Sequence, residues 1–331
     1  EDARVADFEC IELGQTTAND YFKINGDKIT SKELVNAWQS TLEGVFPTKA
    51  KASTMPFDIP LDTKRHGKSA AIKKASPRVI IPVFPQTSSE LDFARAFKNA
   101  GAQPEILVMK NLSPQDIDQS ISAFVESINA AQIIMLPDGS ANFIAIALRN
   151  EKVREAVQKL LENRDGLMLG IGDGFQALIK TGLLSFGSIT DKAPLSPTLT
   201  LNPIGRHVSQ MVYTRITSVK SPWLSLVEAG DVHAVAVSHE EGRFVADDDT
   251  LKQLIENGQI ATQYVDLSGT PCSARPFNPN GSVGAVEGIT SPDGRILGKM
   301  AHSERKGDNL YKNIAFDKDQ KIFESGVLYF K

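Results

Sequence analysis

The chain has 331 residues, of which 41% are hydrophobic and 23% are charged, and its formal net charge is −4. A chain of this length holds one large domain or two ordinary ones, and either buries enough apolar surface to fold without disulfides. The small negative charge does not favour nucleic acid or an anionic membrane as a partner, so we expect neither.

Two cysteines, Cys10 and Cys272, are too few for a disulfide framework and lack the paired spacing of a zinc site. We therefore expect no metal site and a reducing, cytoplasmic location. The sequence has no apolar run of about 18 residues, and its first residues lack the basic and apolar stretches of a signal peptide. It starts with Glu1 rather than Met, as a fragment or a processed chain would.

Residues 1–46 predict a small β/α piece that ends in a helix. In the stretch 31–46, Ser31 can cap the helix and apolar residues recur at helical spacing. Residues 47–77 are rich in Lys, Ser, Thr and Pro without periodicity, which predicts a linker or a connection that lies on the surface. We place the boundary of the main domain, residues 78–331, near residue 77.

From residue 78 onward, short apolar runs alternate with amphipathic helical segments. Strands are predicted at 78–84, 104–109, 131–136 and 166–172, and helices at 88–101, 113–129 and 150–164. This order predicts an α/β fold with a mostly parallel sheet flanked by helices. In such sheets ligands bind at the carboxyl ends of the strands.

The second half of this domain is richer in strands. They are predicted at 207–217, 232–238, 243–246, 261–267 and 295–300, followed by a helix at 319–330. His207 and His233 fall within these apolar strands, where we expect packed structural histidines. The whole region is predicted to be one domain.

The most informative local segment is residues 166–184, an apolar strand that runs into a glycine-rich turn and then a helix. This is the geometry of a nucleophile elbow, which projects one side chain above a sheet and aims backbone N–H groups at an oxyanion. The apex would be Gly172, which has no side chain. A simpler explanation is that Gly170, Gly172 and Gly174 only permit a close turn, and a dinucleotide-binding turn is a weaker alternative.

The same segment resembles the elbow of class I glutamine amidotransferases with a flavodoxin-like fold, and specifically that of phosphoribosylformylglycinamidine synthase. The family pattern G-I-C-N-G-F-Q stands here as residues 170–176. Four further stretches are similar to the same family in the same order, so the resemblance covers nearly the whole chain. They are 38–49, similar to the end of the synthetase portion, 78–102, 238–244 and 278–313.

The resemblance implies a Cys-His-Glu triad that hydrolyses glutamine through a thioester and releases ammonia. His302 and Glu304 match the His and Glu, and Gly172 occupies the position of the lost nucleophile. Gln176, Asp173 and His239 fall on the substrate-binding side of the site. In the family a synthetase region then uses ATP and magnesium. This chain is too short to contain it, so we expect no cofactor here and a synthetase partner in cis or in trans.

Several departures from the family fall on the catalytic apparatus. The nucleophile position holds Gly172, and Asp173 replaces an Asn. The family's glycine-rich oxyanion and lid segment appears as the shorter run 137–144. The family's PGTNCE segment appears as residues 85–90. Loss of the nucleophile and of an oxyanion donor, the latter alone costing about 100- to 1000-fold, predicts negligible glutaminase activity. Asp173 is a poor substitute nucleophile, and Cys272 qualifies only with a base within hydrogen-bond reach.

Some of these residues also have ordinary explanations. Without the resemblance, His302 and Glu304 would be surface polar residues on an exposed loop or strand end. Gln176 either holds glutamine or is a helix-surface amide, and His239 either binds substrate or lies in a solvated loop.

Three hypotheses for function follow. The first is an amidotransferase domain of purine biosynthesis that has lost its glutaminase chemistry, a pseudoenzyme. The second is a glutamine-binding or scaffold module that supports a synthetase partner without turnover. The third is an active enzyme with different chemistry.

Overall fold

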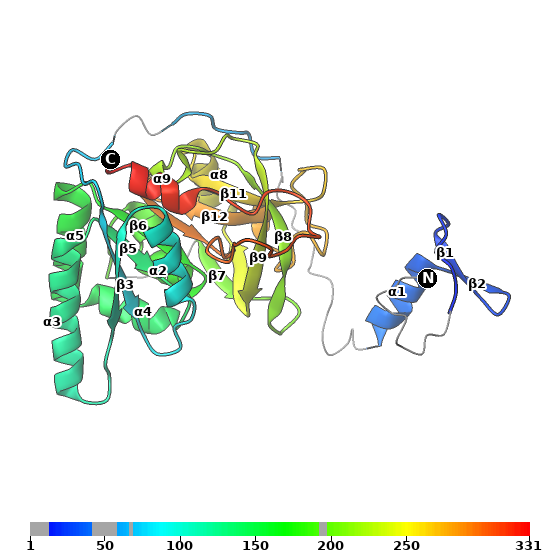
Figure 1. Cartoon of the computed structure of the whole chain (residues 1–331), viewed down its shortest axis with the longest axis horizontal. Helices are drawn as coiled ribbons and strands as arrows, with labels where there is room; N and C mark the ends of the chain where they lie inside the picture. Colours follow the sequence, from blue (N-terminus) through cyan, green and yellow to red (C-terminus); the bar gives the residue numbers. More distant parts are fainter. Residues whose placement is uncertain (1–12, 42–57, 66–68, 192–196) are drawn as a thin grey trace. The chain divides into compact units, whose positions relative to one another are not determined.

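The computed structural model describes residues 13–41, 58–65, 69–191 and 197–331. The chain forms two compact units, Glu1–Thr48 and Lys49–Lys331. The division between them falls at the start of the stretch for which the sequence predicts a linker. Figure 1 shows the elements of each unit.

The first unit contains a β-hairpin and one helix within its described residues. Strands β1 (Tyr21–Ile24) and β2 (Asp27–Thr30) pair antiparallel through the turn Asn25–Gly26, where both residues have positive φ angles, 52° and 99°. Helix α1 spans Ser31–Ser40. Its cap is Thr30 rather than Ser31, because the Thr30 side chain accepts from the backbone N–H of Glu33 while the Glu33 carboxylate accepts from the backbone N–H of Thr30. The predicted helix end at residues 42–46 lies outside the described residues.

Part of the predicted linker packs on the second unit. The backbone of Asp62 exchanges hydrogen bonds with Thr217 and Val219, and the N–H of Ala70 donates to the carbonyl of Tyr329. Ala70 is buried. This described part of the stretch therefore lies along the surface of the domain as a draped connection.

A nine-stranded sheet forms the centre of the second unit within the residues that the structure describes, in the order β4-β3-β5-β6-β13-β12-β11-β8-β9. The first five strands in this order are parallel, and each later strand is antiparallel to its neighbour. The strands are β3 (Arg78–Val83), β4 (Gln103–Val108), β5 (Ile133–Leu136), β6 (Leu167–Ile171), β8 (Val208–Ile216), β9 (Val232–His239), β11 (Ile260–Val265), β12 (Val286–Thr290) and β13 (Ile296–Lys299). A separate ribbon pairs β7 (Thr198–Leu201) with β10 (Glu241–Val245).

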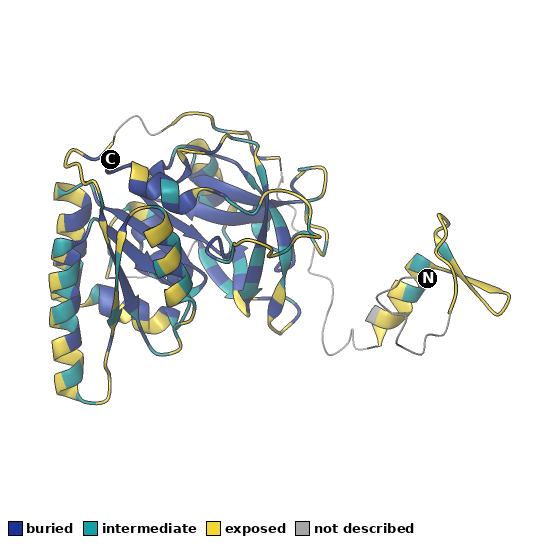
Figure 2. Cartoon of the chain, viewed as in Figure 1, coloured by how far each residue is buried: buried dark blue, intermediate teal, exposed yellow. Residues whose placement is uncertain are grey.

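Helices cover both faces of the sheet. In the central strands alternate residues enter two different cores, as Ile133 and Ile134 of β5 do. One core is closed by α3 to α8 and the other by α2 and α9, and Figure 2 shows the strands buried with the outer faces of the helices exposed. These helices are α2 (Glu90–Asn99), α3 (Pro114–Ala130), α4 (Ala141–Arg149), α5 (Glu151–Asn163), α6 (Asp173–Lys180), α7 (Leu183–Phe186), α8 (Asp248–Glu256) and α9 (Ile322–Leu328). The predicted α/β class is confirmed, and the sheet is mixed.

The strand directions decide which loops meet. Four antiparallel pairings in a row connect β13 to β9, through β12, β11 and β8. Strand β9 therefore runs in the same direction as β13 and as β6, which is parallel to β13. The antiparallel half of the sheet also curls back, because His302, just after β13, forms a β-bridge with Ala236 of β9. The carboxyl ends of β5, β6, β9 and β13 therefore share one edge of the sheet.

No helix among the described residues is long and apolar enough to span a membrane.

Candidate functional site

The predicted strand, turn and helix around Gly172 are present. Strand β6 ends at Ile171, α6 begins at Asp173, and Gly172 between them has φ 60° and ψ −119°. Its N–H donates to the carbonyl of Lys299 at 3.1 Å, and its carbonyl accepts from the N–H of Gln176 at 3.2 Å. A residue with a Cβ is strained in this conformation, whereas glycine adopts it freely.

The flanking glycines allow the helix to approach the sheet closely. A Cβ added to Gly174 would lie 2.1 Å from the carbonyl oxygen of Leu136, and one added to Gly170 would lie 2.6 Å from the carbonyl oxygen of Gly174. Close packing therefore requires glycine at these two positions, while the sharp turn requires it at Gly172.

The carboxylate of Asp138 fills the space above Gly172. Asp138 follows β5, and its Oδ1 accepts from the backbone N–H of Asp173 at 3.0 Å. A Cβ built on Gly172 would lie 2.3 Å from the same oxygen. The position of a nucleophile side chain and the N–H group next to it are thus both taken by one carboxylate.

Asp173 is a partly buried carboxylate close to other carboxylates. Its Oδ2 accepts from the N–H of Gly139 at 3.3 Å. Burial, together with the charges of Asp138 and Glu241, raises the pKa of Asp173 to about 6. At neutral pH this carboxylate is therefore near its titration range.

His302 and Glu304 form the hydrogen-bonded pair that the resemblance implies. Nδ1 of His302 lies 2.7 Å from Oε1 of Glu304, and both side chains are fully buried. The expectation that they lie on an exposed loop or strand end was wrong, because neither side chain is exposed. With Nδ1–H donated to the carboxylate, Nε2 is left as an acceptor, and this buried atom has no hydrogen-bond partner among the described residues.

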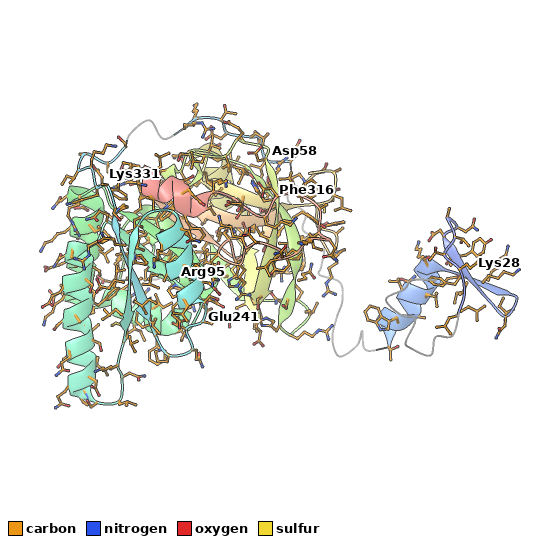
Figure 3. The ribbon with its side chains drawn as sticks, viewed as in Figure 1. Lys28, Asp58, Arg95, Glu241, Phe316 and Lys331 are labelled. Carbon is orange, nitrogen blue, oxygen red and sulfur yellow. The ribbon has the colours of Figure 1, made fainter. Side chains whose placement is uncertain are left out.

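Gln176 is also buried, so it is not a helix-surface amide. Its side chain is 3% exposed, and Nε2 donates to Oε2 of Glu241 at 2.6 Å. Glu241 begins β10, where Figure 3 labels it toward the lower edge of the domain. The contact joins the helix after the elbow to the turn that follows β9.

His239 is the last residue of β9 and is buried, which excludes the solvated-loop alternative. The side-chain NH₂ of Asn202 donates to the carbonyls of Arg206 and His239, so its oxygen faces Nδ1 of His239 at 3.2 Å. Nδ1 must then carry the proton, which leaves Nε2 as a buried acceptor without a partner among the described residues. Burial, with the nearby histidines His207 and His302, lowers the pKa of His239 to about 4.

These loops enclose a cavity of about 430 Å³ at the carboxyl edge of the sheet. It brings together three of the predicted residues, Asp173, Gln176 and His239, while Gly172, His302 and Glu304 lie next to it rather than in its lining. The remaining lining residues are Gln86, Asp138, Gly139, Ser140, Ala141, Asn142, Lys180, His207, Ser238, Glu240, Glu241 and Met300.

Of the remaining described histidines and the cysteine discussed from the sequence, only one lines the cavity. His233 is buried in β9, as expected of a packed histidine, whereas His207 is exposed before β8, bonds Ser238 at 2.9 Å and lines the cavity. The structural role predicted for His207 was therefore wrong. Cys272 is half-buried, and burial raises the pKa of its thiol, which disfavours the thiolate that a nucleophile needs.

Asp138 and Glu241 lie in the stretches 137–144 and 238–244 that were compared with the family, but neither residue was given a role of its own. The signal for Asp138 is its position directly after a buried parallel strand, in the run Leu136-Pro137-Asp138-Gly139, where ligands of α/β sheets bind. Glu241 has no comparable local signal, because the curl of the sheet brings it to the elbow.

An α/β sheet with a strand–turn–helix elbow and a buried His–Glu pair at one edge defines an amidotransferase-like domain. Residues 76–330 match the family of CobB/CobQ-like glutamine amidotransferase domains, and the chain belongs to this family.

Two relatives agree with this family, and a solved structure agrees with the fold. The phosphoribosylformylglycinamidine synthase subunit PurQ of Rhodospirillum rubrum is 31% identical over 229 residues, which cover 68% of this chain and 88% of that protein. The subunit PurQ of Methanococcus maripaludis is 30% identical over 283 residues, covering 78% and 98%. The structure of PurLQS from Thermotoga maritima matches with a TM-score of 0.55 and 23% identity over 77% of this chain and 100% of the matched chain, which supports the fold alone.

Proposed function

We propose that this chain carries the amidotransferase domain of a phosphoribosylformylglycinamidine synthase in purine biosynthesis, and that the domain does not hydrolyse glutamine. The first part is supported by the family and by the names of the relatives. The second part rests on one observation, the carboxylate of Asp138 in the place of a nucleophile side chain above Gly172.

Acyl transfer from an amide needs a nucleophile and donors for the oxyanion that develops. At this elbow Gly172 provides no nucleophile, and the N–H of Asp173, which follows it, already donates to Asp138. A negative charge beside the developing oxyanion would further oppose the reaction. The proposed loss of activity therefore has two causes at this elbow, the missing side chain at Gly172 and the occupied N–H of Asp173.

The His302–Glu304 pair keeps the arrangement of a general base, with Nε2 of His302 as the free acceptor. In the proposed function this pair holds the shape of the site without transferring protons. Ammonia for amidine formation would come from free solution or another glutaminase. ATP and magnesium would belong to a synthetase region, joined to this chain or supplied as a partner.

Glutamate release from glutamine tests the proposal, with the synthetase partner both present and absent. We expect no release above the buffer control from the natural chain or from Gly172→Cys, because the new side chain meets Asp138. The double variant Gly172→Cys, Asp138→Gly removes the obstruction, frees the N–H of Asp173 and should release glutamate. Adding His302→Ala to the double variant should abolish that release.

Turnover by the natural chain would contradict the proposed loss of activity. Full activity of Gly172→Cys alone would contradict the obstructing role of Asp138. The missing nucleophile at Gly172 would then be the whole explanation for the lack of activity.

Binding of glutamine without turnover is a second candidate, favoured by the open cavity beside Gln176. Calorimetric titration of the natural chain with glutamine decides it, because saturable heat without glutamate release supports this candidate and absence of heat contradicts it.

A further inference from the structure

The cavity at the carboxyl edge of the sheet is strongly acidic. Four carboxylates line it, those of Asp138, Asp173, Glu240 and Glu241, against one ammonium group, that of Lys180. Lys180 is itself engaged, because Nζ donates to the side-chain oxygen of Asn142 at 2.9 Å. The cavity therefore presents negative charge to any ligand that enters it.

The carboxylates are held in place by neutral donors rather than by cations. Asp138 accepts from a backbone N–H, Asp173 accepts from another, and Glu241 accepts from the amide of Gln176. Within the described part of the chain, none of these three carboxylates forms an ion pair. Each is oriented through one oxygen by a neutral donor, and the ammonium of Lys180 offsets part of the charge of Asp173, so the group keeps an excess of negative charge that favours a cationic ligand.

An independent observation comes from His239. His239 is among the lining residues of the cavity and is 6% exposed, and Asn202 fixes the proton on Nδ1. Nε2 is consequently a lone-pair acceptor that is buried and has no partner among the described residues. This acceptor is satisfied by an N–H or O–H donor, which a ligand or a bound water molecule can supply.

The acceptors do not form a metal site. Within the described ranges no group of three or more His, Cys, Asp or Glu side chains could hold a metal ion. The cavity of about 430 Å³ is also far larger than a single ion. A larger organic cation can contact acceptors from α6, through Asp173, and from the β9–β10 segment, through His239 and Glu241.

We propose that this cavity binds a small organic amine with two or more ammonium groups, a diamine or polyamine. One ammonium lies between the carboxylates of Asp138 and Asp173, and another donates to Glu241 and His239. The inference rests on the proposed absence of glutaminase activity, since a cavity that held such an amine would not admit glutamine.

Isothermal titration of the whole chain at pH 7.5 with putrescine and spermidine tests this proposal. We expect saturable one-to-one binding that 1,4-butanediol and 4-aminobutyrate do not reproduce. Asp173→Asn and Glu241→Gln each remove a charge at constant volume and should weaken the amine by about tenfold or more, as expected for a charge-assisted hydrogen bond. His239→Phe should weaken it similarly.

A matched control is Glu155→Gln on α5, a 62% exposed carboxylate away from the cavity, which should leave the affinity unchanged. Absence of saturable binding would overturn the inference, as would equal affinity for 1,4-butanediol or equal weakening by Glu155→Gln. Glutamate release by the natural chain would instead overturn the proposed function, so the two failures are distinguishable.

Discussion

At the scale of single residues, the position of the Asp138 carboxylate depends on the absence of a side chain at Gly172. We expect Gly172→Ala to lower the free energy of unfolding by about 2–4 kcal/mol, because the Cβ is strained at φ 60° and overlaps Oδ1 of Asp138. Asp138→Ala should remove the overlap at the expense of the hydrogen bond to the N–H of Asp173. Denaturant unfolding of both single variants and of the double variant measures the coupling.

The double variant Gly172→Ala, Asp138→Ala should have a free energy of unfolding about 1–3 kcal/mol higher than the value obtained by adding the losses of the two single variants. Additive effects would mean that Asp138 moves aside without cost and does not occupy the nucleophile space.

The raised pKa of Asp173 predicts a pH dependence of stability. Its pKa of about 6 in the folded chain exceeds the ordinary value of 3.8, so the folded state holds the proton more tightly and loses stability as pH rises from about 4 to 6. Asp173→Asn removes this loss. We expect the variant to be more stable than the natural chain by about 1–2 kcal/mol at pH 7.5, after allowance for solvent screening, with the difference vanishing near pH 4.

His239 supplies a control of opposite sign. Its pKa is lowered to about 4, so its contribution to stability is present above about pH 6.5 and is lost as pH falls toward 4. His239→Phe should therefore gain stability relative to the natural chain as pH falls through this window. Parallel pH profiles for the two variants would contradict both assignments.

At the scale of elements, β12 and β13 carry a buried ion pair beneath the His302–Glu304 pair. Lys299 and Glu287 approach to 3.3 Å with both side chains fully buried, and burial lowers the pKa of Lys299. Nζ of Lys299 also donates to the carbonyl of Ala301 at 2.8 Å, while Glu287 accepts from the N–H of Ala301 at 2.6 Å. These bonds fix the segment that leads from β13 to His302.

Lys299→Met should lower the free energy of unfolding by about 3–5 kcal/mol, because it leaves the carboxylate of Glu287 buried without its cation. The double variant Lys299→Met, Glu287→Gln should recover most of this loss. Thermal melting of the single and double variants measures it, and a single variant as stable as the natural chain would show that water reaches the carboxylate.

The sequence predicted elements well where hydrophobic periodicity was strong. The parallel strands β3 to β6 and the helices α2, α3 and α5 lie where the pattern placed them. Helices α4 and α8 and strand β12 were missed. The run 137–144, which includes the start of α4, was interpreted through the resemblance as an oxyanion segment. Strand β12 was missed because it contains the charged Glu287, whose ion-pair partner Lys299 lies on β13.

The candidate site was predicted only where chemistry follows from local sequence. The elbow at Gly172 directly follows β6, so its position could be inferred from the local pattern, whereas the pair His302 and Glu304, three and five residues after β13, was assigned through the family resemblance. The burial of that pair, and the meeting of Gln176 with Glu241, depend on the curl of the antiparallel strands. No local pattern encodes that curl.

At the scale of the whole molecule, the sheet core belongs to the unit Lys49–Lys331. Both main hydrophobic cores consist of residues from Ile59 onward. We expect a chain truncated to begin at Lys49 to fold cooperatively, with a Tm within about 3 °C of that of the same transition in the full chain. Calorimetry checks this, and a truncated chain without a cooperative transition would show that the first unit is required for the fold.

The conformation of the turn at Gly172 also bears on how the domain tolerates mutation. A non-glycine residue at this φ and ψ would store about 1–3 kcal/mol of backbone strain, and glycine releases it. Because folded domains lie only a few kcal/mol above the threshold for folding, this margin lets other positions accept substitutions that a strained active enzyme would not survive. Glycine at this turn thus widens the range of sequences that can maintain this fold.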